Sequence, residues 1–225
     1  AQAVDLDAMV GAPCWAAFDL AQTTDMNAWR LLWLLDGHWY TWGRYWVPTE
    51  QVKQRTETNR VSYAGWVDAG LVTPMEGDIT DYDRIGADIL EDCRRFNPRK
   101  IGYDPWNAAS LVNNLTAEGL PLELFVQGYK SYNPAMKECE RAYMSGTLHH
   151  GGDPVLRWNV SNVVPSYDTN MSIKPDRKRS ADKIDGACAL FMAFGLAIGE
   201  KDEGDAEGFF TAPVRSSGAT TGARH

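Results

Sequence analysis

Three short runs of apolar and aromatic residues open the chain. Residues 15–20 (WAAFDL) are almost wholly apolar, which is typical of a short buried strand. Residues 28–35 and 38–46 are two further aliphatic and aromatic runs, separated only by Asp36 and Gly37, a pair favoured in tight hairpin turns. The pattern therefore predicts three consecutive strands, which we expect to pair antiparallel.

The middle of the chain alternates between helical and strand patterns. Residues 99–104 (RKIGYD) and 122–126 predict strands, and a helical pattern follows each of them. The helical patterns lie at residues 48–60, at 80–96, after Pro105 to about Glu118, and at 134–145. The order β-α-β-α requires crossover connections and therefore parallel pairing. Three antiparallel strands followed by parallel βαβα is the layout of an RNase H-like sheet, so we expect an α/β fold with a mixed sheet flanked by helices.

A long apolar segment near the end predicts one more helix, from Ser180 to about Ile198. Ser180 is a typical N-cap residue, and Gly199 suits a C-terminal stop. Beyond it, residues 200–225 are rich in Gly, Ala, Ser, Thr and charged residues, a composition typical of a flexible tail. We expect one domain over residues 1–199 and a flexible C-terminal tail over residues 200–225.

Composition narrows the class of protein. With 44% hydrophobic and 11% aromatic residues the chain can bury a packed core, which excludes a disordered protein. No apolar run approaches the ~18–20 residues of a membrane span, and no leader is visible, so we expect no membrane partner. The start at Ala1 indicates a fragment or a processed product. Free thiols in a reducing cytoplasm are expected for the four widely spaced cysteines, Cys14, Cys93, Cys139 and Cys188.

Charge is distributed unevenly along the chain. The formal net charge of −8 argues against a protein whose whole surface wraps nucleic acid. A local basic strip beside a carboxylate cluster remains compatible with that charge. Five basic residues fall within ten positions before the last helix, namely Lys174, Arg177, Lys178, Arg179 and Lys183. They form either a solvated loop or a rim that contacts phosphates.

Three aspartates stand at the ends of predicted elements. Asp19 interrupts the apolar first strand, Asp104 ends the fourth, and Asp185 lies in the first turn of the last helix. Each has a simpler interpretation alone, as a turn residue, an N-cap, or an acid that suits the helix dipole. Together they converge, because the first and fourth strands are neighbours in an RNase H-like sheet. Two hard cations held close together need oxygen ligands from separate elements.

Four segments strengthen this interpretation. They are AAFDLAQTTDMNA (16–28), RKIGYDPWNA (99–108), HHGGDPVLRWNVSN (149–162) and SIKPDRKRSADKIDGACALFMA (172–193). In this order, and over roughly residues 14–200, they resemble the nuclease domain of tailed-phage DNA-packaging terminase large subunits. The most specific element is IKPD followed by KIDG and an apolar helix.

The resemblance implies an endonuclease that cuts concatemeric phage DNA with two Mg²⁺ or Mn²⁺ ions. It makes Asp19, Asp104 and Asp185 metal ligands, with Asp182 as an outer or fourth ligand and Asp25 as a second acid of the first motif. Lys183 either places a positive charge beside the scissile phosphate or pairs with Asp182. The expected DNA-binding residues are Lys174, Arg177, Lys178 and Arg179.

The same resemblance implies partners and a location. The expected partners are double-stranded phage DNA, the ATPase domain of the same large subunit, the small terminase subunit and the portal, in the host cytoplasm. The chain contains no GxxxxGK[ST] sequence, so we expect no P-loop motor within it. Two alternatives stay open: a docking module of the packaging motor with vestigial catalysis, and another RNase H-like nuclease such as a junction resolvase.

Overall fold

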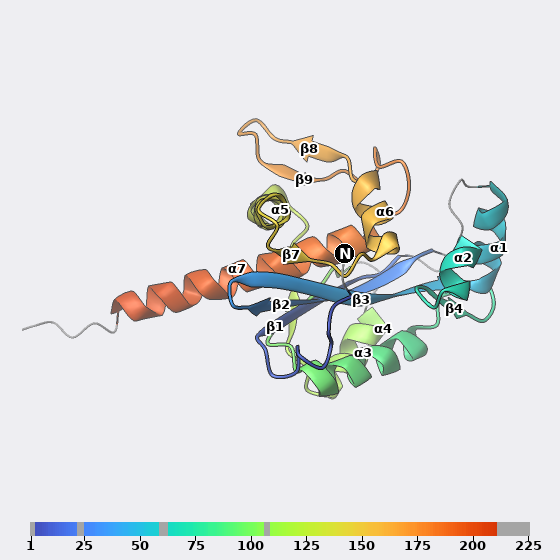
Figure 1. The fold of residues 1–225 in the computed structure, drawn as a ribbon, viewed down its shortest axis with the longest axis horizontal. Helices are drawn as coiled ribbons and strands as arrows, with labels where there is room; N and C mark the ends of the chain where they lie inside the picture. The colour runs from blue at the N-terminus through green and yellow to red at the C-terminus, as the bar shows by residue number, and fades with distance from the viewer. Residues whose placement is uncertain (1–2, 22–24, 59–62, 106–108, 211–225) are drawn as a thin grey trace, which may run out of the picture.

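A mixed seven-stranded sheet forms the centre of the molecule in the computed structural model (Figure 1). The structure describes residues 3–21, 25–58, 63–105 and 109–210. Six strands follow one another in the order β4-β3-β2-β1-β5-β6, and β7 pairs with β3. The strands are β1 (Cys14–Asp19), β2 (Asn27–Leu35), β3 (His38–Pro48), β4 (Thr73–Met75), β5 (Ile101–Tyr103), β6 (Leu122–Leu124) and β7 (Leu148–His149).

The strand pairing confirms the predicted α/β class and its mixed sheet. β1, β2 and β3 are antiparallel neighbours, whereas β5 is parallel to β1 and β6 is parallel to β5. The turn between β2 and β3 uses positive φ angles at Asp36 (53°) and Gly37 (79°), as a tight hairpin turn requires. β4 and β7 add parallel pairs to β3 that the sequence did not predict.

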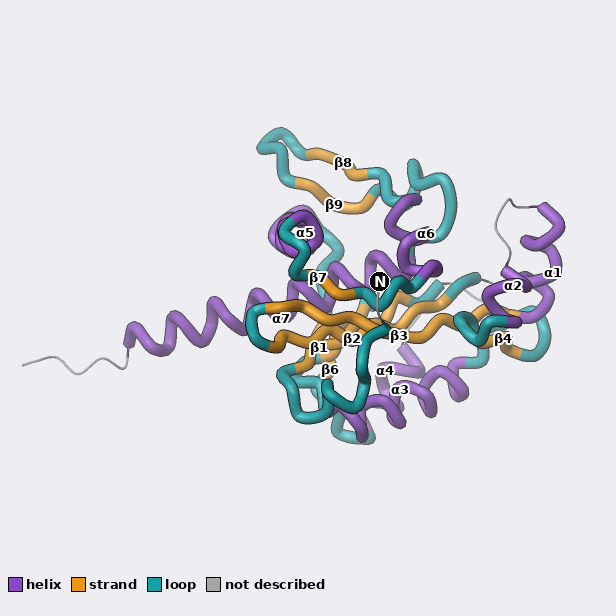
Figure 2. Tube along the Cα trace, viewed as in Figure 1, coloured by secondary structure: helices purple, strands orange, loops and turns teal. Residues whose placement is uncertain are grey.

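Helices cover both faces of the sheet (Figures 1 and 2). One face carries α3 (Tyr82–Phe96) and α4 (Ala109–Ala117). The other carries α5 (Tyr129–Met144), α6 (Pro154–Asn162) and α7 (Asp185–Phe210). Beside α6 lies a two-stranded hairpin of β8 (Pro165–Tyr167) and β9 (Ile173–Pro175), while α1 (Thr49–Thr58) and α2 (Tyr63–Asp68) lie at one end of the sheet.

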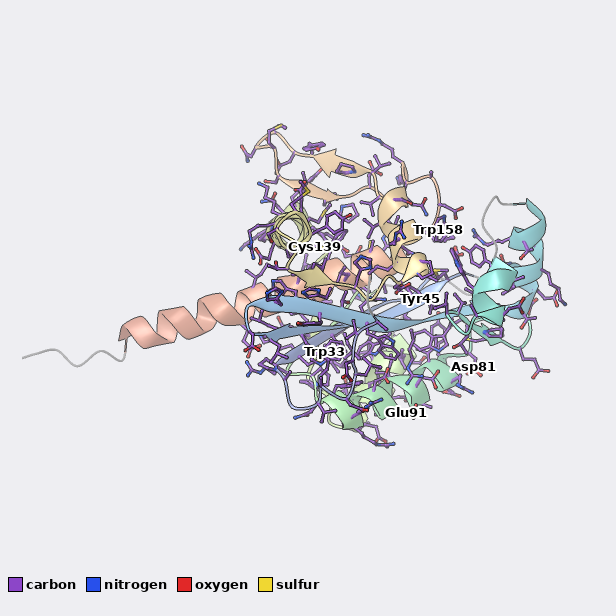
Figure 3. The ribbon with its side chains drawn as sticks, viewed as in Figure 1. Trp33, Tyr45, Asp81, Glu91, Cys139 and Trp158 are labelled. Carbon is purple, nitrogen blue, oxygen red and sulfur yellow. The ribbon has the colours of Figure 1, made fainter. Side chains whose placement is uncertain are left out.

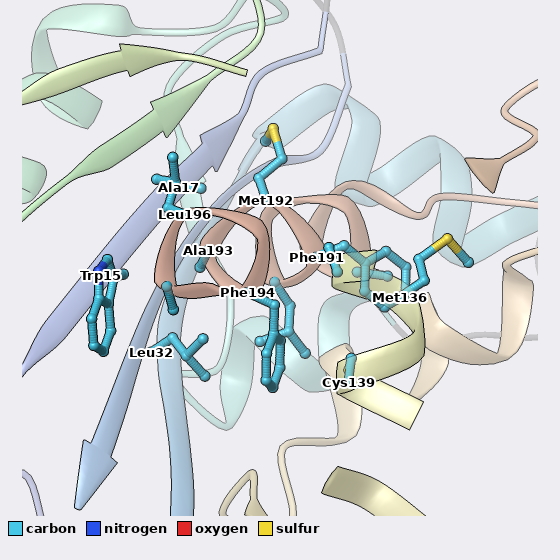
Figure 4. Packing of buried hydrophobic residues seen from close by; sticks show 14 of the residues in the cluster. Trp15, Ala17, Leu32, Met136, Cys139, Phe191, Met192, Ala193, Phe194 and Leu196 are labelled. Atoms are coloured by element: carbon cyan, nitrogen blue, oxygen red, sulfur yellow. The ribbon is translucent and has the colours of Figure 1, made fainter. Parts of the chain in front are cut away.

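Alternation along β1 decides which face each side chain meets. Ala16 and Phe18 join the core cluster that contains Ile85 of α3. Trp15 and Ala17 join the cluster that contains α7, as the close view in Figure 4 shows. Because side chains alternate between faces, Asp19 lies on the same face as Ala17, the face that α7 covers.

The last helix differs from the prediction at both ends. It begins at Asp185 rather than at Ser180, and it continues past Gly199 to Phe210. Ser180 is not its N-cap, because its backbone N–H and its hydroxyl both donate to the carbonyl of Asp176 and close a separate turn. The first part of the predicted tail is therefore helical. Residues 211–225 lie outside the described residues, and the tail stays a prediction there.

Other boundaries moved as well. α5 begins at Tyr129 and contains Pro134, the residue at which the predicted helix began. Residues 59–60 of the helix predicted at 48–60, and residues 106–108 of the helix predicted after Pro105, lie outside the described residues. The sequence pattern did not predict α2, α6 or the β8–β9 hairpin.

The interior is closed and partly polar. All four cysteines are buried and unpaired, which confirms the expected thiols. Arg30 is fully buried, with 0% of its side chain exposed, and pairs with Asp153 at 2.7 Å. In the described part of the chain, no helix is long and apolar enough to cross a membrane.

Candidate active site

Two of the predicted aspartates meet at the carboxyl end of β1. Asp19 is the last residue of that strand and Asp185 the first of α7, and only 2% and 5% of their surfaces are exposed. Phe18 of β1 pairs with Tyr103 of β5 in parallel register. Asp19 follows Phe18 and Asp104 follows Tyr103, so the two aspartates come at the same end of neighbouring strands. α7 packs along β1 and β5 and brings Asp185 to the same end.

The start of α7 is held by α6 and β3. The backbone N–H of Gly186 donates to Oδ1 of the buried Asn159 at 2.9 Å, and Nδ2 of Asn162 donates to the carbonyl of Lys183 at 3.0 Å. Gly186 also lies against Tyr45: a Cβ at position 186 would be 2.6 Å from Cε1 of that ring. A glycine is therefore needed there for the helix to begin beside Asp19.

One guanidinium lies between the two buried carboxylates. Nη2 of Arg177 donates to Oδ2 of Asp19 at 2.5 Å, and Nη1 donates to Oδ1 of Asp185 at 3.4 Å. Burial, and then the charge of Asp19, raise the pKa of Asp185 to about 7, while Arg177 acts in the opposite direction. Two negative groups share this site and are only partly neutralised within it.

The carboxylate pair suits a divalent cation. Oδ2 of Asp185 is buried, and among the described residues it has no hydrogen-bond partner. An unsatisfied buried carboxylate oxygen is costly, and hard cations such as Mg²⁺ take oxygen ligands. Asp104 is half-buried beyond β5, and across the described ranges no three His, Cys, Asp or Glu side chains come together closely enough to hold a metal ion. The structure thus brings Asp19 and Asp185 together, without Asp104.

Asp182 and Lys183 belong to a neighbouring ionic network. Arg55 of α1 bridges Asp25 at 3.0 Å and Asp182 at 3.2 Å. The ammonium group of Lys183 pairs with Asp25, and Oδ1 of Asp182 accepts the backbone N–H of Lys183. Burial lowers the pKa of Lys183. The ion pair that the structure shows for Lys183 is thus with Asp25, a partner that the sequence did not predict.

The basic segment divides into inward and outward side chains. Oδ1 of Asp176 accepts the backbone N–H groups of Lys178 and Arg179, both at 3.1 Å, and so fixes a turn. Lys178 and Arg179 project from this turn and are exposed, while Arg177 points to the carboxylates. Lys174 lies over the ring of Tyr129, with its Nζ 4.9 Å from the centroid.

Sequence reasoning missed two residues of this site and gave a third another role. Arg55 is one of several polar residues on a helix, and the sequence offers no signal that it reaches Asp25 and Asp182. Asn159 looks like an ordinary helical asparagine, although it is fully buried. Arg177 was predicted, but as a DNA contact rather than as the partner of Asp19.

Comparison with known proteins identifies the family of this chain. The family model described as "Terminase large subunit, endonuclease domain" matches residues 2–201. Protein YmfN of Escherichia coli (strain K12) is 35% identical over 214 residues, which cover 88% of this chain and 46% of that protein. The terminase large subunit of Enterobacteria phage HK97 is 32% identical over 205 residues, covering 89% of this chain and 41% of that protein. The chain thus spans less than half the length of these two relatives.

Solved structures share the fold. The crystal structure of the HK97 bacteriophage large terminase superposes with a TM-score of 0.76 at 29% identity, covering 85% of this chain and 42% of that one. The large terminase nuclease of thermophilic phage G20c, solved with bound magnesium, gives a TM-score of 0.53 at 11% identity, over 82% of this chain and 81% of that one. The second match shows the RNase H-like fold alone. The family match and the two relatives show more: the chain belongs to the terminase large subunit family and corresponds to its endonuclease domain.

Proposed function

We propose that this chain is a divalent-metal-dependent endonuclease that cuts concatemeric double-stranded phage DNA during genome packaging. The observation that carries the proposal is the buried pair of Asp19 and Asp185, with an unpartnered oxygen of Asp185 among the described residues. A divalent cation bound there would satisfy the carboxylate oxygens that Arg177 leaves free, and it would also supply the charge that phosphodiester hydrolysis needs. The family match supports it, as does the magnesium bound by the G20c nuclease.

We assign Asp19, Asp104 and Asp185 as ligands of two Mg²⁺ or Mn²⁺ ions, with Asp182 as an outer ligand. When bound, such ions activate a water and neutralise negative charge on the phosphoryl oxygens. The chain's own contribution is to hold the ligand oxygens in place. Burial fixes Asp19 and Asp185, and the contact of Asn159 with Gly186 fixes the helix that carries Asp185.

Lys183 supports the same chemistry through its charge. It lies two residues before Asp185, and its ammonium group favours the ionised form of that carboxylate. Its pairing with Asp25 restrains the side chain beside the site. A phosphate approaching Asp185 would meet the same positive charge, which is the role we assign to Lys183.

The partners follow from the family. We propose that the chain acts with the ATPase domain of the same large subunit, with the small terminase subunit and with the portal, in the host cytoplasm. The chain corresponds to 41% of the HK97 large subunit, which leaves room for such a domain in the whole protein.

Cleavage that depends on metal is the direct test. With Mn²⁺ or Mg²⁺, the purified chain is expected to nick plasmid and to cut linear duplex of unrelated sequences, and excess EDTA should stop both reactions. Asp19→Asn, prepared in parallel, should be inactive and so controls for a contaminating nuclease. Cleavage that persists undiminished in EDTA would contradict the proposal.

Two other outcomes would favour the alternatives. Binding of motor components without any metal-dependent nicking would indicate a docking module. Cutting of branched DNA with linear duplex spared would indicate a junction resolvase.

The exposed side chains of Lys178 and Arg179 are expected to position the DNA backbone. Replacing both by glutamine should weaken duplex binding equally for unrelated sequences, and should reduce the slope of log K against log salt by about two units, roughly one per lost phosphate contact. The measurement is a salt titration of binding by fluorescence anisotropy. Arg94→Gln with Arg95→Gln is the charge-matched control, since these exposed residues lie on α3, across the sheet from α7. An equal change in both double variants would place the basic turn away from DNA.

A further inference from the structure

Arg177 and a metal ion would need the same two carboxylates. The guanidinium is bonded to Oδ2 of Asp19 and to Oδ1 of Asp185. These are the two carboxylates that the proposed function assigns as ligands. A guanidinium and a divalent cation would compete for the space between these carboxylates, because both are positively charged and both need direct contact with the same two groups.

The contact with Arg177 satisfies the pair unequally. Its bond to Asp19 is short, at 2.5 Å, whereas its bond to Asp185 is 3.4 Å and weak. Oδ2 of Asp185 is left without a partner among the described residues. One positive charge thus stabilises two buried negative charges enough to keep them together, but it does not use all of the ligand oxygens.

The side chain of Arg177 is exposed enough to leave the carboxylates. Arg177 lies on the turn fixed by Asp176, and 40% of its side chain is exposed, against 2% for that of Asp19. The guanidinium can leave through rotation of its own side chain, without movement of β1 or α7. Since Lys178 and Arg179 extend from the same turn, a released Arg177 joins the exposed basic residues there.

We propose that Arg177 is a built-in competitor of the catalytic metal ions: it holds Asp19 and Asp185 in the metal-free protein and has to be displaced before metal binds. This inference rests on the proposed function. The fraction of molecules in which Arg177 has left the carboxylates then sets the apparent metal affinity. By reciprocity, bound metal weakens the hold on Arg177 by the same factor.

The test is Mn²⁺ binding to the whole chain, followed by the electron paramagnetic resonance signal of free Mn²⁺ and by calorimetry, without DNA. Arg177→Gln should lower the Mn²⁺ dissociation constant on the order of tenfold, within the range of typical coupling between sites. It should also lower the metal-free melting temperature, because the buried carboxylates lose their partner. Lys178→Gln removes the same charge from the neighbouring exposed position. It controls for long-range electrostatics and should change the constant far less.

The outcomes separate the inference from the function on which it rests. If the unmodified chain binds Mn²⁺ and Arg177→Gln binds no more tightly than Lys178→Gln does, the competitor role is overturned and the metal site stands. Weaker binding by Arg177→Gln would overturn it too, by making Arg177 a support of the site. If neither the unmodified chain nor Arg177→Gln binds Mn²⁺, the metal site itself is wrong. Should Arg177→Gln fail to fold, Arg177→Lys keeps a charge without the two-pronged contact and should tighten binding by a smaller factor.

Discussion

Replacing Asp185 by asparagine is expected to lower the rate of duplex cleavage by more than about a hundredfold. Mutation of a residue that only hydrogen-bonds to a metal ligand already lowers metal affinity or activity by ~10–100-fold, and a lost ligand should cost more. Asparagine keeps the shape of the side chain and loses the charge of a proposed ligand. The measurement is the rate of plasmid nicking in Mn²⁺ at saturating enzyme. Asp83→Asn is the matched control, because Asp83 also lies in the first turn of a helix, exposed and on α3, and it should nick normally.

The same variant is expected to behave differently from an ordinary destabilising substitution. Burial and the charge of Asp19 raise the pKa of Asp185, so its ionised form is unfavourable in the metal-free fold. Removing that charge should leave the melting temperature of the metal-free protein unchanged or raised. Functional residues in other proteins often lower stability in the same way. Mn²⁺ should stabilise the unmodified protein by mass action, and Asp185→Asn should lose most of that gain.

Thermal melts of both proteins, with and without Mn²⁺, decide the matter. A variant that melts well below the parent without metal, and still keeps the full shift on adding Mn²⁺, would make Asp185 a structural residue at the helix start. In that case the assignment of Asp185 as a ligand is wrong, whatever its effect on nicking.

Asp153→Ala is expected to have the largest effect on stability. Oδ2 of Asp153 pairs with the fully buried Arg30 at 2.7 Å and accepts the hydroxyl of Tyr45 at 3.2 Å. Its Oδ1 accepts the backbone N–H groups of Val155 and Leu156, both at 2.9 Å, as the N-cap of α6. Losing the carboxylate leaves a buried charge unpaired, which costs about 3–5 kcal/mol.

Urea denaturation followed by circular dichroism measures the loss. Asp81→Ala is the control, because Asp81 (labelled in Figure 3) caps α3 through the N–H of Arg84 at the surface, so only a cap is lost, at about 1 kcal/mol. Adding Arg30→Met to Asp153→Ala should restore part of the stability, because the unpaired charge is gone. If Asp153→Ala costs no more than Asp81→Ala, the buried ion pair contributes nothing beyond the cap.

Local sequence patterns predicted the long strands of this fold and the turn that has characteristic turn residues. The apolar runs of β1, β2 and β3, and the Asp36–Gly37 turn, are visible in single segments. β4, β7, β8 and β9 have only two or three residues each and, unlike the equally short β5 and β6, do not lie within a longer segment with a strand pattern. Ser180 looked like a helix cap, yet its hydroxyl is engaged by Asp176, so the tertiary setting of the turn overrode the local signal.

The candidate site divides in the same way. Asp19 and Asp185 could be placed together, because strand order and helix position follow from the pattern of elements. The contact between Arg177 and Asp19 could not, because it joins residues 158 positions apart and depends on how one turn is oriented. In sequence, Arg177 is one of several adjacent basic residues, and nothing local distinguishes the inward side chain from Lys178 and Arg179. The sequence gives no sign of the role of Arg55 either, because its contact with Asp25 depends on where α1 lies in the fold.

α7 connects the site at the carboxyl end of β1 to the opposite end of the same strand. Asp185 begins the helix, and Glu200, fifteen positions later, accepts the indole N–H of Trp15 and pairs with Arg99 at 3.0 Å. At ~1.5 Å per residue Asp185 and Glu200 are roughly 22 Å apart along the axis. The contacts of Glu200 therefore restrain the position of the helix along its axis: a displacement by a single residue would move Asp185 by ~1.5 Å relative to Asp19. Asp19 lies on β1, so any shift of α7 along its axis would move Asp185 relative to Asp19, and the two contacts of Glu200 oppose that shift from the other end of the strand.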